Sequence, residues 1–199
     1  CTTLLAAIFN FFMMQRRQFL AQSSLAAGTL LTSDLTSLLP QDRKLGIALV
    51  GLGNYATNQL APALQQTELC QLAGIVTGTP QKAAEWASKY QITQKNIYNY
   101  ETFDQIKDNP DIDIVYVVLP NSMHAEYTIR AAKAGKHVIC EKPMGLNVKE
   151  CEQMIKACKE AKVKLSVGYR LYFEPHHLEV RRLGNEKALG AVKMIESSL

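Results

Sequence analysis

The chain reads Leu49-Val50-Gly51-Leu52-Gly53-Asn54-Tyr55-Ala56 where an apolar run gives way to a helical pattern. In that context Gly51 permits a tight turn, Gly53 lets backbone amides approach a pyrophosphate, and Ala56 keeps the helix close to the strand. Amides at a helix N-terminus, with the helix dipole behind them, favour a bound phosphate. The stretch therefore predicts a dinucleotide-binding loop. The alternative is a tight turn that joins strand to helix and binds nothing.

On either side of this loop, short apolar runs alternate with helical stretches, which is typical of βαβ units around a parallel sheet. We expect strands near residues 44–50, 71–77, 97–100, 112–118, 136–140 and 164–168. Helices are expected near residues 55–66, 80–90, 101–107, 123–134 and 147–161. The pattern predicts an α/β fold with a doubly wound parallel sheet of the Rossmann type over residues 41–170.

After Tyr169 the alternation stops. Glu174 and Pro175 are typical of a helix start, and residues 190–195 have the composition of a strand. A strand there has no visible partner, so we interpret residues 171–199 as the start of a second, truncated domain that serves for substrate binding and oligomerisation.

The composition of the chain argues against several classes of protein. Its 199 residues are 47% hydrophobic and 20% charged, which is ordinary for a globular domain. The net charge of +4 is spread among acidic residues rather than gathered in a stripe, so we expect no nucleic-acid partner. No apolar run of about eighteen residues suggests a membrane span, and no His or Cys spacing suggests a metal site.

The five cysteines do not suggest a disulfide framework. Cys151 and Cys158 are expected on one face of a helix, too far apart to bridge. We interpret the cysteines as small packing residues.

Residues 1–40 are expected to be a targeting leader rather than part of the fold, because Arg16, Arg17 and Asp34 are their only charged residues. The run that resembles a twin-arginine export signal is Met14-Gln15-Arg16-Arg17-Gln18-Phe19-Leu20. This predicts export to the periplasm by the twin-arginine machinery. The alternative is a chance pair of arginines.

The end of the second expected strand bears on cofactor choice. In a dinucleotide-binding fold an acidic residue there holds the adenosine ribose of NAD. Here the sequence reads Val76-Thr77-Gly78-Thr79-Pro80-Gln81-Lys82, without a carboxylate. A hydroxyl and a lysine favour a 2′-phosphate, so Thr77 and Lys82 predict NADP over NAD. The alternative is that Thr77 caps the turn and Lys82 is a solvated helix residue.

The strand at 136–140 leads directly into Glu141, Lys142 and Pro143. The carboxyl ends of strands are where open α/β sheets place their ligands, and proline restricts the backbone of the residue before it. Lys142 is therefore a candidate catalytic residue. The alternative is a surface lysine at the end of a strand.

The glycine loop, residues 119–124, and Glu141-Lys142-Pro143, in this order, resemble the Gfo/Idh/MocA oxidoreductase family. The resemblance runs from about Gly46 to Pro175. It implies a Rossmann domain followed by a larger α/β domain with an open antiparallel sheet, with the nicotinamide between the two. It also implies a set of cofactor-binding residues: Gly51, Gly53, Asn54, Tyr55, Ala56, Thr77, Lys82, Leu119, Asn121, His124, Glu141 and Arg170.

By this resemblance, the full-length protein is expected to be an exported, NADP-dependent sugar oxidoreductase that transfers hydride between the nicotinamide and an aldose or ketose, and to form a homo-oligomer. Lys142, with its pKa lowered by partial burial, would stabilise the oxygen of the reacting carbinol. For His124 the alternative to direct chemistry is a cap or a packed side chain, which is common for a histidine at a helix start. The alternatives are an NAD-dependent glycosidase of the same superfamily and a non-catalytic nucleotide-binding protein.

Overall fold

The computed structural model describes residues 43–196, which belong to two compact units. One unit extends to Gly168 and the other starts at Tyr169. The expected boundary at 170 lies close to this division.

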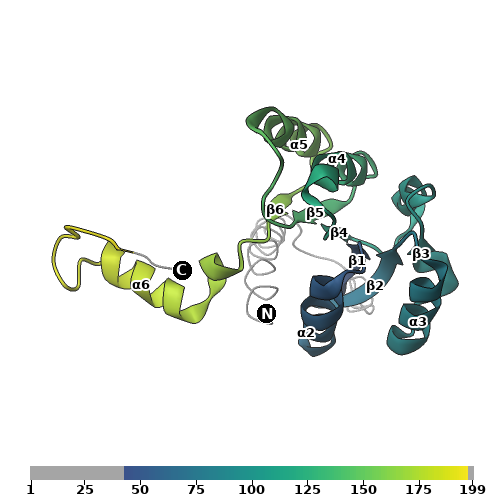
Figure 1. The fold of residues 1–199 in the computed structure, drawn as a ribbon, viewed down its shortest axis with the longest axis horizontal. Coiled ribbons are helices and arrows are strands. Elements are labelled where there is room, and N and C mark those ends of the chain that lie inside the picture. Colours follow the sequence, from purple (N-terminus) through teal and green to yellow (C-terminus); the bar gives the residue numbers. More distant parts are fainter. Residues whose placement is uncertain (1–42, 197–199) are drawn as a thin grey trace, which may run out of the picture. The chain divides into compact units, whose positions relative to one another are not determined.

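The first unit is built on a six-stranded sheet with the order β3-β2-β1-β4-β5-β6 (Figure 1). All neighbouring strands are parallel. The order reverses between β1 and β4, which is the arrangement of a doubly wound Rossmann sheet. The strands are β1 (Leu45–Val50), β2 (Cys70–Val76), β3 (Ile97–Tyr98), β4 (Ile114–Val117), β5 (His137–Cys140) and β6 (Leu165–Val167).

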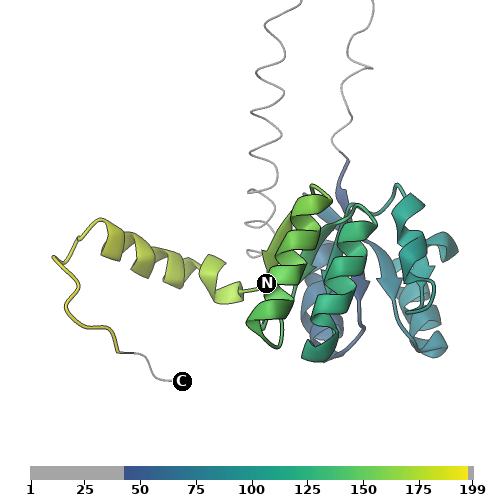
Figure 2. The ribbon, with the colours of Figure 1, turned by 90° about the horizontal axis from the view of Figure 1, so that it is seen from above.

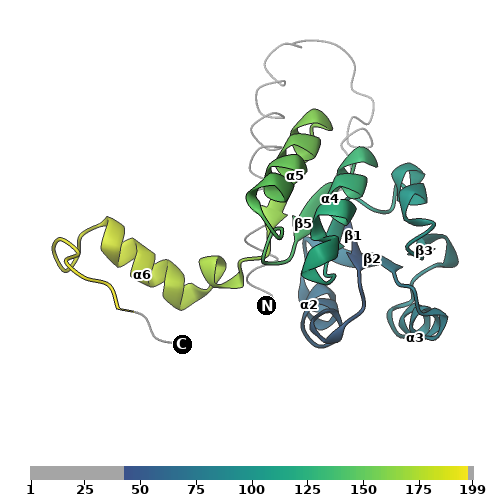
Figure 3. The same ribbon diagram turned by 45° about the horizontal axis from the view of Figure 1, so that its top comes forward.

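Helices cover both faces of this sheet. Figures 1 and 3 show α4 and α5 on one side and α2 and α3 on the other, and Figure 2 shows α4 and α5 side by side. The helix after β1 runs as a π-helical segment, η2 (Ala56–Leu60), into α2 (Ala61–Gln66). The other helices of this unit are α3 (Pro80–Tyr90), α4 (His124–Lys133) and α5 (Val148–Glu160). Short 3-10 helices occur at η3 (Gln94–Asn96), η4 (Phe103–Asp108) and η5 (Asn121–Met123).

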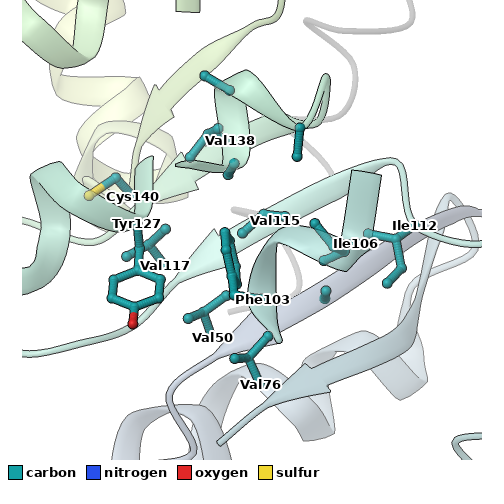
Figure 4. Packing of buried hydrophobic residues seen from close by; sticks show 14 of the residues in the cluster. Val50, Val76, Phe103, Ile106, Ile112, Val115, Val117, Tyr127, Val138 and Cys140 are labelled. Atoms are coloured by element: carbon teal, nitrogen blue, oxygen red, sulfur yellow. The ribbon is translucent and has the colours of Figure 1, made fainter. Parts of the chain in front are cut away.

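A hydrophobic core lies between the sheet and the layer formed by η4, α4 and α5. Alternate strand residues such as Val50 and Val115 face this layer, and Figure 4 shows the ring of Phe103 lying against them. Phe103 is fully buried, and burying a side chain of this size contributes about 1.5–3 kcal/mol to folding. The intervening residues of β4, Ile114 and Tyr116, are buried as well, as expected for a central parallel strand covered on both faces.

The described cysteines of this unit are free thiols. Cys140 and Cys158 are buried, and burial raises the pKa of each thiol to about 11. Cys70 is also buried, whereas Cys151 is half-buried. The interpretation of these residues as packing residues is confirmed for the three buried ones.

The second unit contains η6 (Arg170–Phe173) and α6 (Pro175–Asn185). The helix expected to open at Glu174 and Pro175 is confirmed, with the Glu174 carboxylate accepting the His177 amide at 3.0 Å as an N-cap. The expected strand at 190–195 is wrong, because these residues have no regular secondary structure. A strand needs a partner for its backbone groups, and no described residue pairs with this segment. The antiparallel sheet expected of a second domain is therefore not seen in residues 169–196.

Candidate functional site

The candidate site lies at the carboxyl edge of the sheet, around the point where the strand order reverses. Three segments emerge there from strands that lie next to one another: the glycine loop after β1, residues 118–123 after β4, and residues 141–147 after β5. In open α/β sheets this edge is where ligands bind.

Gly51 can only be glycine in this structure. Its φ of +94° lies in the left-handed region, and a Cβ there would be 2.5 Å from the carbonyl oxygen of Val118. The backbone amide of Gly51 donates to Val76 of β2 at 3.0 Å. The turn thus holds the loop against both neighbouring strands.

Gly53 differs, because a Cβ there would have no neighbour within 4 Å. Helical structure starts at Asn54, and both the amide and the hydroxyl of Thr57 donate to the Gly53 carbonyl at 2.9 Å. Ala56 is fully buried against the sheet, as expected for close packing of helix and strand. The uncovered loop at a helix N-terminus fits a dinucleotide pyrophosphate.

Asn54 is exposed and Tyr55 is half-buried, so both lie at the open side of this first helical turn. Tyr55 also adds to the raised pKa of Tyr116, after burial and the Glu141 carboxylate.

Lys82 reaches the glycine loop from α3. Its ammonium donates to the carbonyl oxygen of Leu52 at 3.2 Å. Thr77 is buried after β2, and its hydroxyl accepts the amide of Thr79 at 3.2 Å. Thr77 thus caps the turn, as the alternative interpretation had it, and its own hydroxyl proton remains to be donated. No carboxylate follows β2 directly, so the two residues suit a 2′-phosphate.

His124 joins the segments after β4 and β5. The ring is 1% exposed, with Nδ1 at 2.7 Å from the carbonyl oxygen of Pro143 and Nε2 at 2.8 Å from that of Leu119. Both nitrogens are therefore engaged with backbone carbonyls, and His124 has the contacts of a packed structural residue. Leu119 is 9% exposed, and its side chain faces Gly51, whereas Asn121 is exposed at the start of η5.

Glu141 lies at the end of β5 and is 9% exposed. Its Oε1 accepts the hydroxyl of Tyr116 at 2.6 Å, and its Oε2 accepts the backbone amide of Lys142 at 3.2 Å. The pKa of Tyr116 is raised well above its usual value, first by burial and then by the Glu141 carboxylate. A sequence signal for this pair exists in hindsight, because a tyrosine inside an aliphatic strand needs a partner for its hydroxyl.

The expected partial burial of Lys142 is not found. Its side chain is exposed, and among residues 43–196 nothing pairs with its ammonium by hydrogen bond or ion pair. The peptide bond to Pro143 is cis. The exposed lysine side chain thus projects from a backbone whose amide donates to Oε2 of Glu141.

The second unit contains Arg170, an exposed residue at the start of η6. The twin-arginine segment lies outside the described residues. Within the described part of the chain, no helix has the length and apolarity needed to cross a bilayer, and no three His, Cys, Asp or Glu side chains are grouped to hold a metal ion.

Comparisons with known proteins agree with this geometry. The model of an oxidoreductase family with an NAD-binding Rossmann fold, Gfo/Idh/MocA, matches residues 45–169. The chain is similar to the crystal structure of aldose-aldose oxidoreductase from Caulobacter crescentus in complex with glycerol, at 51% identity and a TM-score of 0.72 over 73% of this chain and 44% of that one.

Two further relatives are more distant. A 3-ketoreductase from Actinomadura kijaniata, in complex with TDP-benzene and NADP, is 25% identical with a TM-score of 0.65, over 74% of this chain and 45% of that one. D-xylose 1-dehydrogenase (NADP(+)) of Haloarcula marismortui is 30% identical over 158 residues, which are 79% of this chain and 44% of that protein. The chain thus spans less than half the length of each of these three proteins.

The match of the family model to residues 45–169 covers the whole Rossmann sheet, from β1 to β6, with the glycine loop and the Glu-Lys-Pro segment. The chain therefore belongs to the Gfo/Idh/MocA family of oxidoreductases with an NAD-binding Rossmann fold.

Proposed function

We propose that the full-length protein is an NADP-dependent sugar oxidoreductase, similar to glucose-fructose oxidoreductase, that acts on an aldose or ketose by reversible hydride transfer. The observation that carries the proposal is the position of Lys142. It follows a buried strand at the carboxyl edge of the sheet, beside a glycine loop that fits a dinucleotide, and its ammonium is exposed. The names of two relatives, an aldose-aldose oxidoreductase and a D-xylose 1-dehydrogenase, support a sugar as the substrate.

NADP, when bound, supplies the acceptor for the hydride. On this proposal the amides after Gly53 hold the pyrophosphate, and Thr77 and Lys82 hold the 2′-phosphate. Leu119, Asn121 and Glu141 lie on the nicotinamide side, with Arg170 contributing from the second unit. The 3-ketoreductase and the D-xylose dehydrogenase carry NADP in their names, which supports the choice of cofactor.

Lys142 donates a hydrogen bond to the oxygen of the reacting carbinol. In the oxidation the hydroxyl proton leaves to a general base or to water and the C–H electron pair leaves as hydride. The negative charge that develops on the oxygen as its proton leaves would be stabilised by a positioned ammonium more in the transition state than in the ground state. Because the ammonium has no described protein partner, all of its donors are available to the sugar.

We further propose that the protein is exported to the periplasm by the twin-arginine machinery and forms a homo-oligomer at full length. The support for export is Arg16-Arg17 in an otherwise weakly charged N-terminal segment. The support for an oligomer is the resemblance to the family. Fractionation of cells with Arg16 and Arg17 both replaced by lysine tests the first, and sedimentation tests the second.

The central experiment measures NADP reduction by the full-length protein with a panel of aldoses. Lys142→Ala is expected to lower turnover by about a hundredfold or more, while NADPH binding measured by fluorescence is retained. Lys149→Ala, an exposed lysine on α5, is the matched control and should leave turnover unchanged.

Unchanged turnover in Lys142→Ala would make Lys142 a surface lysine at a strand end. Hydrolysis of a glycoside without net reduction of NADP would replace the proposal with a glycosidase. Tight NADP binding with no turnover of any sugar by the parent protein would leave a nucleotide-binding protein.

A further inference from the structure

The position of Lys142 must come from its backbone, because its side chain has no described partner. The backbone amide of Lys142 donates to Oε2 of Glu141 at 3.2 Å. The amide of Glu141 in turn donates to Val117 of β4 at 3.0 Å. The carboxylate of Glu141 is thus a direct link between the end of the sheet and the residue that follows it.

That carboxylate is itself held from β4. Glu141 is 9% exposed, and a buried carboxylate is costly unless its oxygens accept hydrogen bonds. The hydroxyl of Tyr116 donates to Oε1 at 2.6 Å. Tyr116 is fully buried, with Leu49 of β1 and Ile139 of β5 as its strand neighbours, so its hydroxyl has little freedom to choose another acceptor.

Gly168, at the end of β6, closes the other side of the carboxylate. A Cβ at this position would be 2.7 Å from Oε1 of Glu141 and 3.1 Å from the hydroxyl of Tyr116. The amide of Gly168 donates to the carbonyl oxygen of Cys140 at 2.8 Å, which fixes its distance from β5. Three neighbouring strands therefore each contribute one residue to this contact.

In the contact between Tyr116 and Glu141, the hydroxyl is the donor and the carboxylate is the acceptor. Burial, and then the neighbouring carboxylate, raise the pKa of Tyr116 well above its usual value, so the phenol stays protonated and donates over the working range of pH. Glu141 accepts from both Tyr116 and Lys142, and neither bond involves the lysine ammonium.

We propose that Tyr116 is a positioning residue for Lys142, acting through Glu141, with Gly168 providing the space that the carboxylate needs. The inference rests on the proposed function, because it assigns a role within the same site. Tyr116 touches neither substrate nor cofactor on this proposal. Its hydroxyl fixes Oε1, the rigid carboxylate then fixes Oε2, and Oε2 fixes the amide from which the reacting ammonium projects.

The test is Tyr116→Phe in the full-length protein. The single-turnover rate of hydride transfer is expected to fall about tenfold to a hundredfold, since small misplacements of a reacting group have effects of this size. The Kd for NADPH and the KM for the sugar should change little. Tyr98→Phe is the matched control, because it removes another buried hydroxyl, the partner of Asn109 at 2.7 Å, near the opposite end of the sheet.

A double-mutant cycle separates action through Glu141 from a general effect on the core. In a Glu141→Gln background, Tyr116→Phe should lower the rate little further, because the acceptor it positions is already altered. Additive losses would overturn the proposal, as would an unchanged rate in Tyr116→Phe. A weakened Kd for NADPH with the rate retained would overturn it too, and would make the hydroxyl part of the cofactor site.

A second variant and a second measurement keep the inference testable in every case. Gly168→Ala displaces the same carboxylate from β6 and carries the test if Tyr116→Phe does not fold. Hydrogen exchange of the Lys142 amide, followed by NMR on protein labelled with ¹⁵N-lysine, should be faster in Tyr116→Phe and Gly168→Ala than in Tyr98→Phe. This measurement needs no turnover, so equal exchange in all three overturns the positioning role even if the proposed function fails on other grounds.

Discussion

The ammonium of Lys82 can hold the glycine loop and bind an anion at the same time. Its ammonium donates to Leu52 within the glycine loop at 3.2 Å, and the residue is otherwise exposed. An ammonium has three donors, so one can hold the loop while the others bind an anion. The interpretation of Lys82 as a solvated helix residue is therefore incomplete, because its charge lies at the loop.

Lys82→Ala is expected to reduce the preference for NADP over NAD by about tenfold, since one charge-assisted hydrogen bond to the 2′-phosphate is lost. Affinity for NAD should also fall slightly, because the loop loses its contact with α3. Fluorescence titration of NADPH and NADH measures both effects, with Lys89→Ala on the same helix as the control. Equal affinity of the parent protein for the two cofactors would contradict the assignment to NADP.

The role of a single residue could be predicted from the sequence where only one residue type meets the structural requirement. Gly51 could be predicted because only glycine tolerates both its φ and its contact with Val118. For Tyr116 the sequence indicates only that a buried hydroxyl needs a partner, and not which one, because the accepting carboxylate is 25 positions away in the chain. The exposure of Lys142 also could not be read from its neighbours, since burial depends on which elements pack over it.

The loop that starts at Lys142 ends in a capped helix, α5. The side chain of Asn147 accepts the amide of Glu150 at 3.0 Å, and Glu150 reaches back to accept the amide of Leu146 at 2.8 Å. This is a reciprocal arrangement in which two unpaired amides of the helix start find partners. The cap thus fixes the far end of the segment whose near end carries Lys142.

Asn147→Ala is expected to lower the free energy of unfolding by about 1 kcal/mol, the usual cost of losing such a cap. Urea unfolding followed by circular dichroism measures the change. Lys149→Ala, two positions further along the same helix and exposed, should have an effect within about 0.5 kcal/mol of zero. An equal loss in both variants would mean that the cap contributes nothing specific.

Elements were predictable where the hydrophobic pattern was long and regular. All six strands of the sheet were expected within a few residues of their observed bounds, because each is a short apolar run between helical stretches. The segment expected as a helix at 101–107 is a 3-10 helix at Phe103–Asp108, too short for pattern alone to tell the two types apart. The strand expected at 190–195 failed because strand propensity without a pairing partner does not form a strand.

For the molecule as a whole, the division at Gly168 separates a complete sheet from the residues that follow. Within residues 43–168, each of the six strands pairs with a neighbouring strand, and the helices pack their apolar residues on the sheet. The relatives compared above are more than twice as long as their match to this chain, and the family resemblance implies that the substrate is held by the later part.

A protein made of residues 43–168 alone is therefore expected to unfold cooperatively and to bind NADPH, but to show no sugar oxidation. Calorimetry, fluorescence titration and a turnover assay check the three parts of this expectation. The full-length protein is the positive control for turnover. Measurable oxidation by the isolated Rossmann unit would show that the substrate site is contained within it.

The buried thiols of this unit have a consequence for where it can remain folded. None of its four described cysteines forms a disulfide, and burial keeps the thiols of Cys140 and Cys158 protonated, with pKa values of about 11, and away from oxidants. The fold of residues 43–168 thus contains no disulfide that a reducing environment could break. Its assembly does not depend on oxidation of these cysteines.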